Sequence, residues 1–351
     1  MLYIEKANVK KTEEPIHNLF HDKKQQLDKQ EKDNLFAQIV KSGRRRRIVR
    51  WSKTFAILVL CSLSGLWLYY QSNIMKESPS LSVVEVSEKH KELVRGKEET
   101  TILSADARGN AWEIYKEGWQ QMANLDSIHI DAIDTREAEY TTIYVPYGSR
   151  KEIIMSDGSK VWLNAGSLFT FRNNMLQHDR ETYLDGEGYF DIATNGKPFT
   201  IHTFNSEVKV LGTSFNLSSY EEDKMTSLDL ITGKVRFSSR QNKFKAVDME
   251  AGQRISYDET KNVVTLDRNS KGNDIMWTKK QLVLDNSTLP YLISRLEKIY
   301  NVEIVFKKKI KDDEPYSGRL NLDVDVVTAL KSIYEFRNYE IRLEGRRVVI
   351  Q

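Results

Sequence analysis

The sequence contains one cysteine, Cys61, in 351 residues. An intramolecular disulfide needs two cysteines, so a disulfide framework is excluded. A zinc site built on several thiolates is excluded for the same reason. We therefore expect no cofactor and no metal centre, and we expect the fold to be held together by packing and hydrogen bonds alone.

Common catalytic signatures are missing too, because the chain has no G-x-S-x-G, no P-loop and no G-x-G-x-x-G. Asp185, Glu187 and Asp191 in LDGEGYFDI could in principle supply the two acids of a glycosidase. However, Asp185-Gly186 is typical of a hairpin turn, which would place Glu187 and Asp191 on the solvated face of one strand. The sequence therefore predicts no catalytic residue and no enzyme.

Charge is divided unevenly along the chain. Residues 1–53 carry 14 Lys and Arg against 7 Asp and Glu, whereas residues 71–351 carry 39 against 43. The near-neutral net charge of +3 is therefore a sum of +7 and −4, and residues 54–70 between the two parts carry no charge.

Residues 54–70 predict one membrane-spanning helix. The 22 residues between Lys53 and Lys76 are uncharged, which at about 1.5 Å per residue spans a hydrocarbon core of roughly 30 Å. A cleavable signal peptide, a buried core helix and a nucleic-acid-binding arginine run are weaker alternatives. By the positive-inside rule, residues 1–53 are cytoplasmic and the rest is exported. The topology determinants are Arg44, Arg45, Arg46, Arg47, Arg50 and Lys53.

The cytoplasmic stub, residues 1–53, is too short and polar to build a sizeable core. Leu35 and Ile39, and Phe36 and Val40, are each four residues apart and would form one apolar stripe on a helix. Such a stripe beside a membrane is typical of a docking element for the bilayer or for a partner. The alternative is that it simply extends the spanning helix.

Residues 71–270 predict an all-β domain. Alternating apolar and polar residues recur in short runs, and nine of the 17 glycines lie between Gly148 and Gly252, mostly in turn contexts. This pattern favours a sandwich, barrel or β-solenoid.

Residues 275–351 predict a different unit, with the order β-α-β-β-α-β-β. Asn286-Ser287-Thr288 offers an N-cap, and Pro290 follows in the first turn of a helix. A small unit of this kind has open sheet edges that suit strand addition by a partner. The residues we predict on partner-facing strands are Leu282, Leu284, Val302 and Ile304.

Five blocks within residues 145–351 together resemble a known family. They are VPYGSRKEIIMSDGSKVWLNAGSLFTF, ETYLDGEGYFDI, KPFTIHT, VKVLGTSFNLSSY and LVLDNSTLPYLISRLEKIYNVEIVF. In this order they resemble FecR-type anti-sigma factors of the Bacteroidetes form, in which a FecR domain precedes a C-terminal domain like the short N-terminal module of secretins and TonB-dependent receptors. NLFAQIVKSGRRRR, at 34–47, resembles the end of the family's cytoplasmic region.

The resemblance implies a single-pass inner-membrane protein with a cytoplasmic N-terminus and periplasmic C-terminal domains. It implies an extracytoplasmic-function sigma factor as the cytoplasmic partner, and the N-terminal signalling domain of a TonB-dependent outer-membrane transducer as the periplasmic partner. The genes controlled would serve uptake of a glycan or an iron chelate.

A tethered glycan-binding module is the second hypothesis. Aromatic rings form sugar platforms, and Trp112, Trp119, Trp162 and Trp277 lie in the exported part. Their strand-like context favours core packing instead.

Overall fold

The computed structural model describes residues 28–30, 33–34, 36–38, 41, 59–67, 81–113, 126–132, 138–270, 272–308, 314–333, 336 and 338–351. The chain divides into two compact units, Met1–Glu77 and Ser78–Gln351. In the first unit, residues 59–67 are helical and their large apolar side chains are exposed. No helix among the described residues is long and apolar enough to cross a membrane. The predicted span, 54–70, extends beyond the described residues at both ends and stays a prediction.

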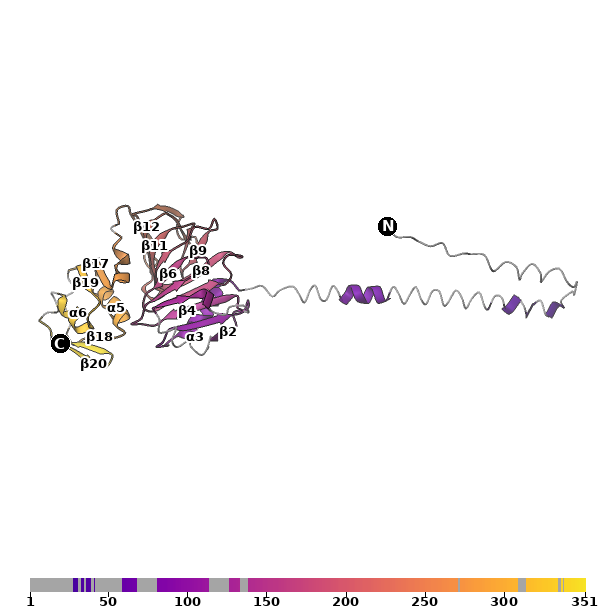
Figure 1. Ribbon diagram of the computed structural model, residues 1–351, viewed down its shortest axis with the longest axis horizontal. Coiled ribbons are helices and arrows are strands. Elements are labelled where there is room, and N and C mark those ends of the chain that lie inside the picture. The colour runs from indigo at the N-terminus through magenta and orange to yellow at the C-terminus, as the bar shows by residue number, and fades with distance from the viewer. Residues whose placement is uncertain are drawn as a thin grey trace. The chain divides into compact units, whose positions relative to one another are not determined.

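The β-rich part of the second unit is one sixteen-stranded sheet folded into two layers (Figure 1). One layer has the order β2-β1-β4-β7-β8-β9-β10-β13-β14, and the other has the order β3-β5-β6-β8-β11-β12-β15-β16. Among the described residues, neighbouring strands of this sheet are antiparallel, except that β8 is parallel to β9 and β3 is parallel to β5. The strands are β1 (Thr101–Ala105), β2 (Ala111–Glu113), β3 (Ser127–His129), β4 (Tyr140–Val145), β5 (Lys151–Ile154), β6 (Lys160–Leu163), β7 (Ser167–Arg172), β8 (Arg180–Asp191), β9 (Phe199–His202), β10 (Ser206–Val210), β11 (Ser214–Ser219), β12 (Met225–Thr232), β13 (Lys234–Ser239), β14 (Val247–Glu250), β15 (Arg254–Asp258) and β16 (Val263–Asp267). Short 3-10 helices are η1 (Ile130–Ala132), η2 (Glu221–Asp223) and η3 (Asn273–Lys279).

Strand β8 belongs to both layers. Its first half pairs with β7 and β9, and from Gly186 onward it pairs with β11 and β6. Gly186 has φ of 138°, and a Cβ there would lie 2.5 Å from the Cα of Ser167. Only glycine therefore suits this close approach, at the point where the strand passes from one layer to the other. The predicted hairpin turn at Asp185-Gly186 is wrong, because both residues lie inside one continuous strand.

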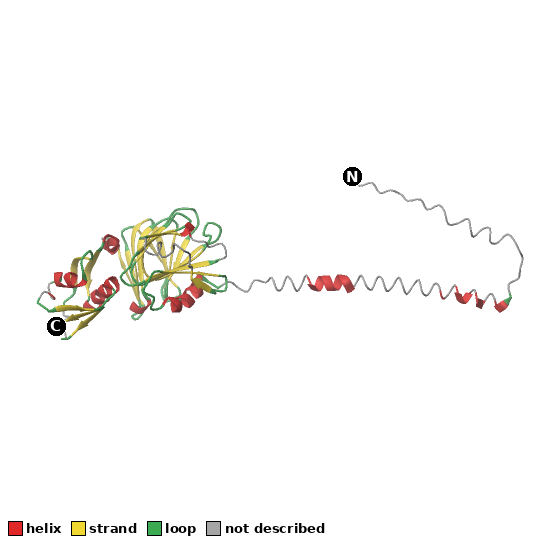
Figure 2. Ribbon diagram, turned by 60° about the horizontal axis from the view of Figure 1, so that its bottom comes forward, coloured by secondary structure: helices red, strands yellow, loops and turns green. Residues whose placement is uncertain are grey.

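A single apolar core fills the space between the layers. It includes Ile143 and Phe169 from the first layer and Phe190, Phe215 and Leu228 from the second, each almost fully buried. This arrangement is a sandwich, and the expectation of a mainly β fold is confirmed (Figure 2).

Helix α3 (Val83–Val94) packs on the outer surface of the first layer. Ser82 and Glu85 form a capping box that fixes the start of the helix. Val83, Val86 and Val94 supply apolar contacts. The other buried contacts are polar.

A chain of side-chain hydrogen bonds lies beneath α3. His90 Nδ1 is 2.6 Å from Thr142 Oγ1, which is 2.8 Å from Thr170 Oγ1, and Ser87 Oγ is 2.9 Å from the same Thr170 atom. All four residues are fully buried. The other ring nitrogen, Nε2, is buried without a hydrogen-bond partner among the described residues, so a charge on this imidazole would be unfavourable and the packing of α3 depends on neutral His90.

The C-terminal module has the predicted order of elements. It consists of β17 (Gln281–Ser287), α5 (Leu289–Tyr300), β18 (Glu303–Phe306), β19 (Tyr316–Asn321), α6 (Val326–Ser332), β20 (Ile341–Glu344) and β21 (Arg347–Ile350). Strands β17 and β19 pair with each other, while β18, β21 and β20 form a separate sheet. Thr288 caps α5 and Asp325 caps α6, as their side chains accept hydrogen bonds from the first-turn backbone. The module has its own core, centred on Leu292, Leu296 and Leu330.

The packing of α3 through buried His90 predicts that the stability of the folded protein depends on pH. Burial, with the charge of Lys89 acting in the same direction, lowers the pKa of His90 from 6.5 to about 4. The contribution of His90 to stability is therefore complete above pH 6.5 and is lost as the pH falls towards 4. We expect the gap in melting temperature between the full-length chain and its His90→Gln variant to shrink from pH 8 to pH 5.

His178 provides the matched control because it is exposed. The His178→Gln variant should track the unmodified protein at every pH. Parallel loss of stability in the His90→Gln variant and the unmodified protein would contradict the role of His90.

Candidate functional site

A buried carboxylate on β8 lies at the junction between the sandwich and the C-terminal module. Glu187 is 3% exposed. Its Oε2 accepts a hydrogen bond from Asn164 Nδ2 at 2.6 Å and another from Arg295 Nη2, and its Oε1 accepts one from Asn216 Nδ2 at 3.1 Å. The carboxylate therefore has three donors, two from the sandwich and one from the module. The prediction that Glu187 lies on a solvated strand face is wrong, because α5 covers this part of β8.

Arg295 approaches Glu187 from α5. It follows Leu292 by three residues, so it lies next to the apolar stripe that packs into the module's own core. Its guanidinium carbon is 5.9 Å from the ring centroids of both Tyr220 and Tyr291. Burial alone would lower the pKa of Arg295, but the charge of Glu187, the nearby Tyr291 and Tyr220 and the hydrogen bond to Glu187 together outweigh burial and raise the pKa well above its ordinary value. Arg295 and Glu187 thus form a buried ion pair between the modules.

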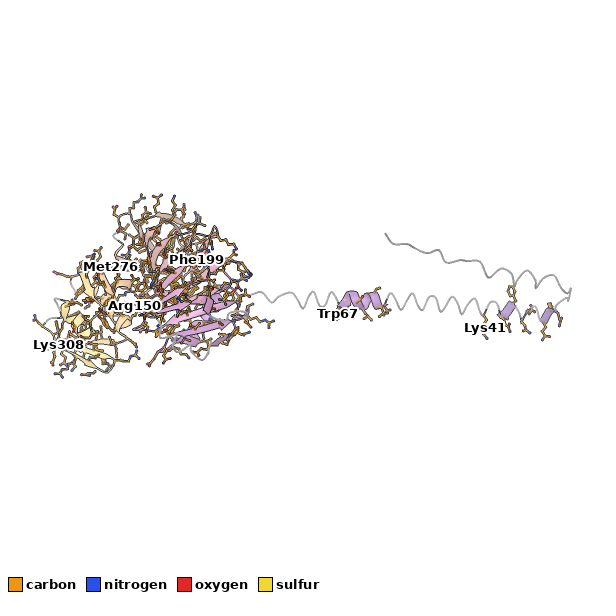
Figure 3. All side chains as sticks on the ribbon, in the orientation of Figure 1. Lys41, Trp67, Arg150, Phe199, Met276 and Lys308 are labelled. Carbon is orange, nitrogen blue, oxygen red and sulfur yellow. The ribbon has the colours of Figure 1, made fainter. Side chains whose placement is uncertain are left out.

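Two asparagines hold the Glu187 carboxylate in a fixed orientation. Asn216 Oδ1 accepts a hydrogen bond from Trp277 Nε1 at 2.9 Å, and Asn164 Oδ1 accepts one from Arg150 Nε at 3.2 Å. Arg150 also donates to the carbonyl of Trp277 at 3.1 Å, and Figure 3 shows it where the two modules meet. Each asparagine accepts with its oxygen and donates with its nitrogen, so the amide groups of both asparagines are paired, whereas the buried Nε of Arg295 has no hydrogen-bond partner among the described residues.

A second cation on α5 contacts the acidic turn η2. Lys298 lies one turn after Arg295, with its Nζ 4.1 Å from the ring centroid of Tyr220. The same Nζ is 2.9 Å from Glu222 Oε1 and 3.4 Å from Asp223 Oδ2. The C-terminal module is therefore tied to the sandwich at β8 and at η2.

Helix α3 contacts the same two elements. Lys91 forms ion pairs with Asp185 on β8 and, at 2.6 Å, with Glu221 on η2. Burial opposes protonation of Lys91, but its hydrogen bonds to Asp185 and Glu221 outweigh burial and raise the pKa of Lys91. Strand β8 and η2 thus connect the helix that follows the predicted membrane segment to the C-terminal module.

The rim of the junction is more exposed. The backbone nitrogen of Gly148 donates to the carbonyl of Lys298 at 2.9 Å, and Arg346 forms an ion pair with Glu98 at 3.0 Å. Both side chains of this last pair are more than 60% exposed. Exposed pairs of this kind contribute little to stability.

The three carboxylates of LDGEGYFDI have separate partners. Asp185 pairs with Lys91, Glu187 pairs with Arg295, and Asp191 accepts a hydrogen bond from Ser214 Oγ at 2.8 Å. They form contacts within the fold and do not face one another across a cleft. Among the described residues, no group of three or more His, Cys, Asp and Glu side chains is placed to hold a metal ion.

The residues predicted to face a partner are placed as follows. The side chains of Leu282, Leu284 and Ile304 are buried in the core of the module, and Val302 packs against that core. Their role on partner-facing strands stays a prediction, and the backbone of β17 has an edge that no described strand covers. Phe36 is 71% exposed in the stub. The other predicted docking and topology residues lie outside the described residues: Leu35, Ile39, Val40, Arg44, Arg45, Arg46, Arg47, Arg50 and Lys53.

The aromatic residues considered for glycan binding do not form one platform. Trp277 is buried and hydrogen-bonded, whereas Trp162 packs against Tyr189 with ring centroids 5.3 Å apart. Trp112 is 42% exposed on β2, and Trp119 lies outside the described residues.

The Glu187–Arg295 pair predicts a large effect of single substitutions. Removing one partner of a buried ion pair leaves an uncompensated charge, so we expect Arg295→Met to lower the free energy of unfolding by about 3–5 kcal/mol. The double variant Glu187→Gln, Arg295→Met should be less destabilised than the sum of the two single variants, by roughly 0.5–3 kcal/mol. Urea denaturation of the four proteins measures this coupling.

The exposed Arg346–Glu98 pair offers a matched control. Arg346→Met should change the free energy of unfolding by less than about 1 kcal/mol. Additive effects of the two substitutions at Glu187 and Arg295 would show that the pair does not act as one unit.

Comparison with known proteins agrees with this architecture. Residues 141–236 match the model of the family described as FecR protein, and residues 281–350 match that described as FecR, C-terminal. No curated protein matches the chain. Two crystal structures of a proposed anti-sigma factor from Parabacteroides distasonis, at 2.50 and 1.65 Å resolution, are 27% and 26% identical to it. Each superposes with a TM-score of 0.54, and each match covers 60% of this chain and 98% of the chain in the crystal structure.

The two family matches lie on the two parts that Glu187 and Arg295 join, in the order seen in the sequence. Regulators of this family act on a sigma factor and are not enzymes. The chain thus carries matches to the FecR and FecR C-terminal family models in that order and is similar to FecR-type anti-sigma factors.

Proposed function

We propose that this protein carries a signal across the bacterial inner membrane, from a TonB-dependent outer-membrane transducer to an extracytoplasmic-function sigma factor. Residues 1–53 contact the sigma factor in the cytoplasm, residues 54–70 cross the membrane, and residues 71–351 receive the signal in the periplasm. The genes under control serve uptake of a glycan or an iron chelate.

The order of parts along the chain carries this proposal. A stub with an exposed Phe36 comes first, and an uncharged segment follows in which Leu60, Leu63, Leu66 and Trp67 are all more than half exposed. A helix that is apolar on all sides suits a lipid environment. The FecR domain and the C-terminal domain come last. Six cations directly precede the uncharged segment, and the positive-inside rule assigns that end of the segment to the cytoplasm.

Sigma-factor binding is tested at Phe36. We expect the full-length chain to co-purify with the sigma factor encoded beside its gene, and Phe36→Asp to weaken that complex by at least about tenfold, because it removes an exposed apolar anchor. Asn34→Asp is the matched control, since residues two apart lie on nearly opposite sides of a helix. Equal binding by the Phe36→Asp and Asn34→Asp variants would count against the docking role of the stub.

Membrane topology is tested with a periplasm-active alkaline phosphatase fused after Gln351. We expect the fusion to be active and to lose activity when Arg44, Arg45 and Arg46 become Ser, because the positive-inside signal is then weaker. Replacing Lys6, Lys10 and Lys11, which lie far from the segment, removes the same charge and should leave activity unchanged. An inactive fusion on the unmodified chain would refute the proposed orientation.

A further inference from the structure

A cleft of about 650 Å³ lies between the sandwich and the C-terminal module, and we call it the inter-module cleft. Its floor comes from the ends of β11, β12, β15 and β16, and its wall comes from β17 and the first turns of α5. Glu187 and Arg295 both line it. The cleft therefore exists only while the two modules are docked.

The charge of this cleft differs from that of two other cavities in the described part of the chain. Its acidic lining residues are Glu187, Asp223, Asp267 and Asp285, and its basic ones are Arg254 and Arg295. Glu187 is paired with Arg295 and Asp223 with Lys298, so the excess negative charge comes from Asp267 and Asp285 against Arg254. A second cavity, of about 700 Å³, has five acidic and five basic lining residues, and a third, of about 800 Å³, has two acidic and four basic. Asp285 is exposed and has no ion-pair or hydrogen-bond partner among the described residues. The inter-module cleft thus favours a positively charged occupant.

The wall of the cleft is the edge of a strand. Consecutive residues of β17, from Gln281 to Val283 and again from Asp285 to Ser287, line the cleft. Side chains of a strand alternate between its two faces, so a run of consecutive lining residues means that the backbone edge looks into the cavity. Among the described residues β17 pairs only with β19, which leaves this edge open. An open edge accepts an added strand from another chain.

Two exposed apolar side chains flank this edge. Met225, at the start of β12, and Tyr291, in the first turn of α5, both line the cleft and are each 45% exposed. A large apolar residue left half exposed beside an unpaired strand is typical of a surface that a protein covers.

We propose that the inter-module cleft binds an extended, positively charged segment of the transducer's N-terminal domain, which adds a strand to β17. The inference rests on the proposed function and specifies where and by what chemistry the partner docks. Strand addition requires backbone N–H and C=O groups, which a glycan lacks, so the occupant is a polypeptide. Because Glu187 and Arg295 hold the two walls together, their ion pair organises the docking site in advance.

The test measures binding of the purified N-terminal domain of the TonB-dependent receptor encoded beside the gene to the full-length chain in detergent. We expect Asp285→Lys to weaken binding about tenfold or more, since it cancels the excess negative charge. Tyr291→Ser should weaken it several-fold through loss of apolar contact. Binding to the unmodified chain should also fall as salt is raised from 50 to 300 mM.

Matched controls separate this cleft from other surfaces. Asp179→Lys makes the same charge change at an exposed residue outside all three cavities, and Leu343→Ser removes an exposed apolar residue from β20, on the other sheet of the module. Both variants should bind within about twofold of the unmodified chain.

The outcomes distinguish the two proposals. If the receptor domain binds but Asp285→Lys and Tyr291→Ser have no effect, or if only Leu343→Ser weakens binding, the cleft is not the docking site and the proposed function stands. If the unmodified chain does not bind the receptor domain at all, both proposals are overturned.

Discussion

The buried ion pair between Glu187 and Arg295 is the contact on which the arrangement of the exported unit depends. The apolar core of the sandwich ends at β15, and that of the C-terminal module begins at β17. The junction between them is polar, and its centre is one carboxylate with three donors. A buried pair of this kind adds little net stability but penalises every arrangement that leaves one charge unpaired. It therefore fixes the pose of the module more than it strengthens the fold.

The same logic extends to α3. Its dock combines three valines with the buried chain of Ser87, Thr170, Thr142 and His90, and Lys91 adds ion pairs to β8 and η2. Successive residues of η2 serve the two helices, since Glu221 pairs with Lys91 of α3 and Glu222 pairs with Lys298 of α5. A displacement of either helix would leave part of this acidic turn without its cation. The pose of the C-terminal module and the dock of α3 are thus linked through shared charges.

The sequence predicts the architecture better than the junction. Period-two alternation and glycine-rich turns indicated a β fold, and the helical spacing from Leu289 to Ile299 indicated the module, because both patterns follow from burial within one element. Glu187 was misplaced because its environment comes from α5, more than 100 residues away. The turn predicted at Asp185-Gly186 failed since glycine there serves a close approach to Ser167. A weak signal for Arg295 existed, as a charged residue beside the apolar stripe of a helix needs a partner.

The junction between the sandwich and the C-terminal module is a polar contact, which we call the seam, between two blocks that each have their own apolar core. This arrangement has a mechanical consequence. Each block keeps its own core when a seam opens, so separation exposes hydrogen-bonding groups that water can satisfy and leaves the large apolar surfaces covered. The cost of opening is then concentrated in the few charges that lose their partners, chiefly Glu187, Arg295 and Lys298. A partner that binds the inter-module cleft stabilises the closed seam, because it contacts both walls at once. By the same linkage, the strength of the seam sets the affinity of the cleft.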